Sequence, residues 1–214
     1  ISEFTFKDCI AIKSLDLSNV TTINKGAFQK CSNLETIKLG KIEYATKEAF
    51  YGCDKLQYNK EENGNLLYLG NDTNKTLLLV SAESLTIDEC TVSATTVVVA
   101  DKAFNNCSYL KKIILSDSIK ALPGQAFANC TVLEYTKDEN GLYLGSAANP
   151  HMVLAGIVLK SVEDFKLNKD VKIICDNAFE GYHALEDISF EGTEAEWNAI
   201  VKSANWNGNL TVNV

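Results

Sequence analysis

A short motif recurs six times along this chain of 214 residues, and it constrains the fold more than any other feature. Its frame is A-F-x-x-C-x-x-L-x-x-I-x-L, and neighbouring copies lie 22 or 23 residues apart except across two longer gaps. A fixed period of this length is typical of repeat proteins, in which each unit stacks on the next. Every copy has a phenylalanine at the second position of the frame, namely Phe6, Phe28, Phe50, Phe104, Phe127 and Phe179.

The two longer gaps, of 54 and 52 residues, have similar contents. Residues 62–70 read E-N-G-N-L-L-Y-L-G, and residues 139–145 read E-N-G-L-Y-L-G. Each is followed by a turn-rich stretch and then by an apolar run, a pattern that predicts a β-hairpin. We therefore expect hairpins inserted near residues 58–80 and 135–159, within an internal duplication of two short repeats and one long repeat.

The L-x-x-I-x-L part of the frame predicts a short strand with one buried face, because its apolar residues alternate. One such unit cannot bury that face alone, so the units must stack into a solenoid with parallel strands about 4.8 Å apart. The Ala-Phe pair then lies on the opposite wall, where we expect the phenylalanines to stack as a buried spine. Cysteine suits the corner that leads into the strand, because its side chain is small and usually buried.

The frame resembles the leucine-rich repeats of the bacterial BspA-like (Treponema-type) class, and so do the inserted N-G-(x)-L-Y-L-G hairpins. The resemblance extends over essentially the whole chain. It implies an α/β-type leucine-rich repeat solenoid with short parallel strands, a mostly irregular convex side, inserted β-hairpins and a C-terminal capping helix. The chain departs from the class in two ways: the proline that often follows the strand is missing, except for a shifted Pro123, and the last repeat has Tyr182 in place of cysteine.

The C-terminal segment has the pattern of a cap. Thr193 and Glu196 have the spacing of a capping box, and Trp197, Ile200, Val201 and Ala204 would share one face of a helix over 193–204. A short strand is expected over 209–214. We expect a single domain, with the solenoid over residues 1–191 and the cap over 192–214, because a solenoid needs its open end covered.

Composition and charge exclude several classes of function. The formal net charge is −8 and all 20 basic residues are lysine; an acidic chain without arginine is a poor ligand for nucleic acid. The longest apolar run has eight residues (152–159) and is far too short to span a bilayer, so we expect no membrane insertion in this segment. The sequence begins at Ile1 with no leader pattern, and we expect any signal peptide or anchor to have been removed.

No residue pattern predicts catalysis, a cofactor or a metal. Five of the seven cysteines occupy one repeat position, and no C-x-x-C pair occurs; a ladder of buried free thiols is favoured over a disulfide framework, a metal site or a nucleophile. His151 and His183 are the only histidines and lie in turn-like segments. Four carboxylates lie beside turn glycines, in two pairs adjacent in sequence, and we expect exposed turn residues rather than a glycosidase pair; they are Glu61, Glu62, Asp138 and Glu139.

The resemblance implies a non-enzymatic module for adhesion or protein binding, located outside the cell or at the cell surface. We expect a monomer that binds a host extracellular or cell-surface protein through the concave repeat face. The alternatives are a structural stalk in a larger surface protein and, less favoured, a hydrolase. Tyr58 and Tyr135 are the preferred anchors, because tyrosine is enriched at interfaces, although each could instead pack under its inserted hairpin. The other candidates are strand residues that point away from the core: Thr36, Lys38, Lys112, Ile114, Asp187 and Ser189.

Overall fold

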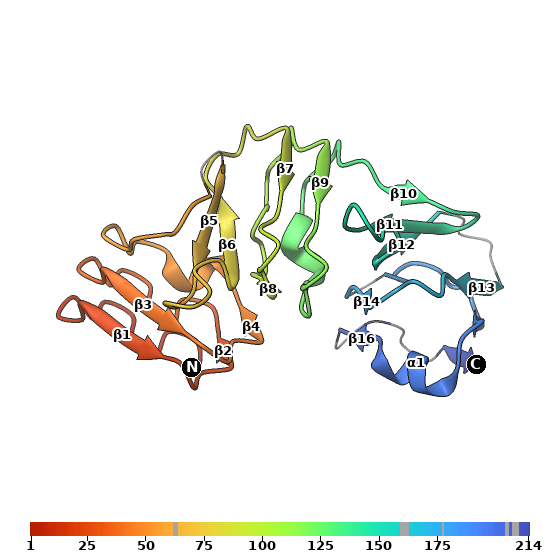
Figure 1. Ribbon diagram of the computed structural model, residues 1–214, viewed down its shortest axis with the longest axis horizontal. Coiled ribbons are helices and arrows are strands. Elements are labelled where there is room, and N and C mark those ends of the chain that lie inside the picture. Colours follow the sequence, from red (N-terminus) through yellow and green to blue (C-terminus); the bar gives the residue numbers. More distant parts are fainter. Residues whose placement is uncertain (62–63, 159–162, 177, 204–205, 207–209) are drawn as a thin grey trace.

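A computed structural model describes residues 1–214 except 62–63, 159–162, 177, 204–205 and 207–209. The chain forms a solenoid of about eight turns with short strands and few helices, which confirms the predicted fold class. In Figure 1 the turns follow an arch from the N-terminus to the C-terminal helix. Most turns contribute a strand of three or four residues to a first row, and several also contribute a two-residue strand to a second row.

The first row contains the predicted L-x-x-I-x-L strands. In β1 and β3 the apolar residues pair across the parallel ladder, Leu15 with Ile37 and Leu17 with Leu39, and their side chains point inward. Threonine and lysine between them in β3 are exposed, as the alternation predicts. The strands of this row are β1 (Ser14–Leu17), β3 (Thr36–Leu39), β7 (Glu89–Thr91), β9 (Lys112–Ile114), β13 (Asp164–Leu167), β15 (Asp187–Phe190) and β17 (Thr211–Asn213).

A second row of strands was not predicted, because two residues are too few to show an alternating pattern. Its members lie along the inner side of the arch in Figure 1. Parallel pairing joins Ile23 to Ala45 at one end and Ile173 to Val201 at the other. These strands are β2 (Thr22–Ile23), β4 (Tyr44–Ala45), β8 (Val98–Val99), β14 (Ile173–Ile174) and β16 (Val201–Lys202).

Both inserted hairpins are present and form part of the solenoid wall. The first pairs β5 (Leu66–Leu69) with β6 (Leu78–Ala82), and the second pairs β11 (Gly141–Leu144) with β12 (Val153–Ile157) and the short β10 (Thr136–Lys137). Each has a register shift just before its tyrosine, Tyr68 or Tyr143, and both tyrosines are fully buried. β6 continues in parallel with β8, and β12 with β14. The shared register confirms the internal duplication.

The F-x-x-C segments form the corners that lead into the first row. Two contain 3-10 helices, η1 (Lys47–Phe50) and η2 (Gly124–Phe127). The thiols of Cys31, Cys53 and Cys130 donate to the carbonyl of the phenylalanine one turn earlier, at 3.0, 3.0 and 3.1 Å. The residue before the cysteine position has positive φ in every copy, a conformation that glycine and asparagine tolerate best; these residues are Asp8, Lys30, Gly52, Asn106, Asn129 and Gly181.

The phenylalanine spine is present but interrupted. Rings stack in one run from Phe6 through Phe28 to Phe50, with centroids 5.6 and 6.0 Å apart. A second stack joins Phe104 to Phe127 at 5.2 Å. Phe127 is only half-buried, so the expectation of a fully buried line was wrong at this position. Between the runs the long repeats insert their hairpins, which displace one turn from the next.

The C-terminal cap is shorter than expected. Helix α1 covers Glu194–Ala199 and begins with the predicted capping box between Thr193 and Glu196. It ends before Val201 because this residue continues the second row as β16, paired with Ile173. Trp197 packs near Phe190 and Trp206, so the segment covers the apolar end of the solenoid. Ala204, expected on the same helix face, lies outside the described residues.

Candidate functional site

The residues between the apolar positions of the first-row strands form one surface, which we call the strand face. On β1 and β3, Ser14 lies beside Thr36 and Asp16 beside Lys38. On β9, Lys112 and Ile114 lie beside Glu89 and Thr91 of β7. The structure therefore places these candidates on neighbouring strands with their side chains exposed or half-exposed. We expected this surface to be concave, but the inner side of the arch carries the second row of strands instead (Figure 1).

The strand face contains a first groove, which we call groove A, of about 510 Å³. Its floor is formed by β1 and β3, and its wall by the first hairpin and the segment that precedes it. Groove A brings Thr36, Lys38 and Tyr58 together, three of the predicted binding residues. Their neighbours there are mainly polar: Ser14, Asp16, Gln57, Asn59, Asn71, Asp72 and Lys75.

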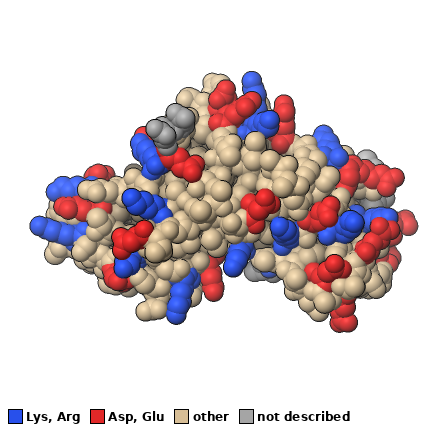
Figure 2. Space-filling model, viewed as in Figure 1, with Lys and Arg blue, Asp and Glu red and all other residues tan. Residues whose placement is uncertain are grey.

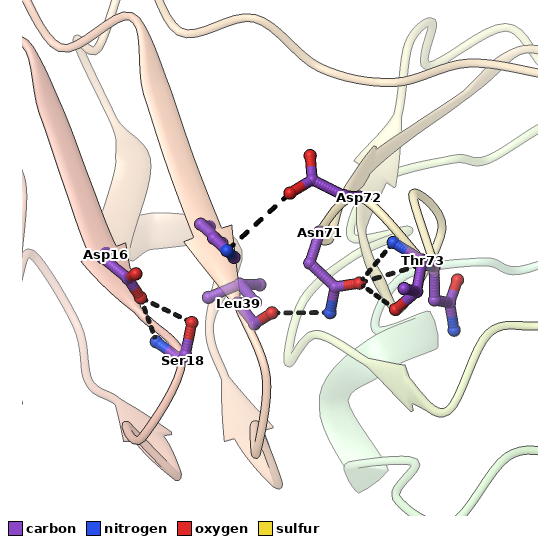
Figure 3. A network of polar contacts seen from close by, with 8 residues as sticks. Asp16, Ser18, Leu39, Asn71, Asp72 and Thr73 are labelled. Carbon is purple, nitrogen blue, oxygen red and sulfur yellow. Dashed lines mark hydrogen bonds and ion pairs between the residues drawn. The ribbon is translucent and has the colours of Figure 1, made fainter.

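A turn from the first hairpin fixes the wall of groove A by hydrogen bonds (Figure 3). Asn71 Nδ2 donates to the carbonyl of Leu39 at 2.7 Å, and Asn71 Oδ1 accepts from the backbone N–H groups of Thr73 and Asn74 at 3.0 and 2.9 Å. Asp72 then reaches Lys38, with Oδ2 3.7 Å from Nζ. Together with the Leu39 N–H, which donates to the Gly70 carbonyl at 2.9 Å, these contacts anchor the inserted turn on β3.

Groove A contains charged side chains of both signs, and one of them, Asp16, has a lowered pKa. Hydrogen bonds from the side chain and backbone of Ser18 hold the pKa of Asp16 below its usual value, with a smaller contribution from Lys38. Lys38 and Asp72 are largely exposed, so their ion pair contributes at most about 1 kcal/mol to stability. These groups are therefore available to pair with a ligand.

A second groove, groove B, has a volume of about 500 Å³ and lies between the first hairpin and the β7–β9 pair. It includes the predicted residues Lys112 and Ile114. Its other lining residues are Glu61, Gly64, Asn65, Leu66, Tyr68, Glu89, Cys90 and Thr91. Asp187 and Ser189 lie further along the row on β15, half-buried, and line neither groove.

Tyr58 and Tyr135 occupy equivalent places at the start of the two long repeats, and both are half-buried against the core. Burial raises the pKa of each phenol above its usual value. Tyr58 also lines groove A, so it combines packing with an exposed edge. Its role in binding, and that of Tyr135, remains a prediction.

Charge on the visible face of the molecule is mixed. Lysine and acidic side chains are interspersed towards both ends, and uncharged residues fill much of the centre (Figure 2). A surface of this kind does not produce a strong field of one sign. Recognition there would depend on local pairs, such as those in groove A, and on shape.

The surroundings of the cysteines fit a role in packing rather than in chemistry. All seven are free thiols. Burial raises the pKa of Cys53 to about 11 and that of Cys175 to about 12, so both thiols are protonated near neutral pH and are poor nucleophiles. Within the described residues there is no group of three or more His, Cys, Asp or Glu side chains that could hold a metal ion. In the same part of the chain, no helix has the length and apolar character needed to cross a membrane.

Sequence reasoning did not identify Asn71 and Asp72 as site residues. The signal was present, because Gly70 followed by Asn-Asp-Thr-Asn is typical of an Asx turn. The second hairpin uses Ser146 in the same way, with its Oγ accepting from the N–H groups of Ala148 and Asn149. What the pattern could not reveal is that the turn folds back onto β3.

The chain matches the family described as "BspA type Leucine rich repeat region" in 6 copies, over residues 1–73, 82–148 and 158–206. Similar solved structures include a leucine-rich repeat protein from T. pallidum (18% identity, TM-score 0.32, 89% of this chain and 65% of the other). Another is a leucine-rich repeat protein from Bacteroides ovatus (19% identity, TM-score 0.29, 94% of this chain and 54% of the other). A third is a leucine-rich cell surface protein from Faecalibacterium prausnitzii (14% identity, TM-score 0.27, 90% of this chain and 82% of the other). This chain therefore spans less than two thirds of the length of the first two. No curated protein matches it.

Proposed function

Because the chain belongs to the BspA-type leucine-rich repeat family, we propose that it is a non-enzymatic protein-binding module that engages its partner through the strand face. The partner is an extracellular or cell-surface protein, and the module acts outside the cell or at the cell surface. Support for the location comes from the family alone. The choice of surface is supported by the grooves.

The observation that carries the proposal is the composition of groove A. It combines charged side chains of both signs, the exposed edge of Tyr58 and several amide side chains beside a hydrogen-bonded pair of strands. Protein interfaces use this combination: an aromatic residue supplies contact area, and the polar rim supplies orientation. The wall is held by the Asn71 bond to Leu39, so groove A is formed before any partner arrives.

Charge reversal at Lys38 tests the proposal. Lys38 points out of β3 and its only ion pair is an exposed one within the described residues, so Lys38→Glu should change the unfolding midpoint little. Binding to a panel of purified extracellular matrix proteins, measured by biolayer interferometry, should weaken about tenfold or more for the protein that binds the wild type, because like charges then face each other.

Lys41→Glu is the matched control. Lys41 is exposed and lies two residues after the end of β3, but it does not line groove A. The same change of charge there should leave binding within about twofold, since a rim charge outside the contact acts only through screened fields. Equal binding by both variants and the wild type would contradict the use of groove A, and failure of every matrix protein to bind would contradict a matrix protein as the partner.

A further inference from the structure

Within the part of the chain that the structure describes, no other strand covers one edge of β7. In the first row it pairs with β9 on one side only, and the pair forms a two-stranded sheet of its own. The preceding strand of the chain, β6, instead joins β5 and β8. Groove B lies along the uncovered side.

The hydrogen bonds show which backbone groups face groove B. The Asp88 carbonyl accepts from Lys111 and Lys112 N–H groups, and the Val92 N–H donates to Ile114, so even-numbered residues bond towards β9. Backbone direction alternates along a strand, so Glu89 and Thr91 face the other way. Among the described residues, the Thr91 N–H and the carbonyls of Glu89 and Thr91 have no hydrogen-bond partner.

Hydrogen bonds limit the uncovered part of the β7 edge at both of its ends. Beyond Thr91, Tyr68 Oη accepts from the Ser93 N–H at 3.1 Å, and Asn74 Nδ2 donates to the Thr95 carbonyl at 2.7 Å. Before it, Asp88 Oδ1 accepts from the Glu89 N–H at 2.9 Å. The free groups therefore lie in a short stretch bounded on both sides, the length of a few residues of extended chain.

Comparison of the two copies of the internal duplication shows how the surroundings of β7 differ from those of its counterpart, β13. The residue of the second copy that corresponds to Cys90 is Phe165, which is fully buried and packs edge-on against Phe179 at 5.5 Å. Cys90 is much smaller and only half-buried, and it lines groove B beside Leu66 and Tyr68. The first copy therefore has an apolar recess beside a free strand edge.

We propose that groove B binds an extended polypeptide segment as an added strand on the edge of β7. Side chains of an extended segment alternate, so one set would enter the recess at Cys90 and must be apolar and of moderate size. The other set would face Glu61 and Glu89, with Lys112 one strand further away beside Glu89, and should be basic because the nearer groups are acidic. The inference rests on the proposed function for the strand face, and goes further in naming the conformation and chemistry of the bound segment.

Two variants of Thr91 test whether a peptide pairs with the edge of β7. The probe is a fluorescein-labelled Lys-Val-Lys-Val-Lys-Val-Lys peptide, and binding is measured by fluorescence anisotropy. Thr91→Pro removes the free N–H without affecting the bonds to β9, and proline is tolerated on such an edge. Thr91→Val keeps the N–H. We expect Thr91→Pro to weaken binding about tenfold or more, and Thr91→Val to stay within about twofold of the wild type. Unchanged far-ultraviolet circular dichroism and unfolding midpoint establish that both variants are folded.

The peptide Lys-Pro-Lys-Pro-Lys-Pro-Lys has the same charge but cannot pair as a strand, and we expect it to bind about tenfold more weakly. Lys38→Glu, which changes groove A, should leave binding of the valine peptide unchanged, so a failure here is distinct from a failure at groove A. Equal binding of the two peptides, equal binding by Thr91→Pro and wild type, or no saturable binding up to millimolar peptide would each overturn the proposal.

Discussion

Among the residues of the repeat frame, Phe104 shows most clearly how core packing stabilises the solenoid. It is completely buried, its ring stacks on Phe127, and its N–H donates to the carbonyl of Ala126 in the next turn. Truncation would leave a cavity that the flanking turns cannot fill. We expect Phe104→Ala to lower the free energy of unfolding by about 3–5 kcal/mol, measured by urea denaturation.

Tyr109→Ala is the control for that change. Tyr109 is an aromatic residue five positions later with 62% of its surface exposed, so its loss should cost less than about 0.5 kcal/mol. A loss below about 1 kcal/mol for Phe104→Ala would contradict the role of the spine. The spine residues could be predicted from the frame, but the half-exposure of Phe127 could not, since the equivalent Phe50 is buried.

Among the elements, the inserted hairpins depend on glycines at the end of β5 and β11. A Cβ on Gly70 would lie 2.0 Å from the Asn74 carbonyl oxygen, and a Cβ on Gly145 would lie 2.0 Å from that of Asn149. Both neighbours are backbone atoms and cannot move aside. Gly70→Ala should therefore destabilise the chain by about 2 kcal/mol or more and should loosen the turn that forms the wall of groove A.

Gly156→Ala is the matched substitution in β12. There the nearest atom to the new Cβ is 3.8 Å away, an ordinary contact. Thermal unfolding followed by circular dichroism should show a change of less than about 0.5 kcal/mol for this variant. If Gly70→Ala were equally mild, the account of the turn would be wrong.

The strands and hairpins differ in how far sequence could predict them. Alternation in L-x-x-I-x-L and the repeated N-G-(x)-L-Y-L-G segments were sufficient for β1, β3 and the hairpins. The second row could not be predicted, because two-residue strands have no alternating pattern in the sequence. Residues such as Ile23 and Ala45 are extended because they pair with the neighbouring turn. The same row ends α1 early, at Ala199, by drawing Val201 into the ladder with Ile173.

At the scale of the whole molecule, the repeat period was sufficient to predict the solenoid but not the grooves on its surface. Thr36, Lys38 and Tyr58 could be named as candidates from the frame, and the structure brings them together in groove A. The groove itself depends on a contact between Asn71 and Leu39, 32 residues apart in sequence. Contacts of that kind follow from where an insertion folds, which no local pattern encodes.

The most direct test of the central claim is a lysine acetylation footprint of the complex with the matrix protein that binds best, read by mass spectrometry. Lysines are the only basic side chains of the chain and occur on several faces. The account predicts that Lys38 and Lys75 in groove A and Lys112 in groove B are protected on binding, while Lys120 and Lys172, which lie next to second-row positions, are labelled as in the free protein. Protection of Lys120 and Lys172 with unchanged labelling of the other three would contradict it.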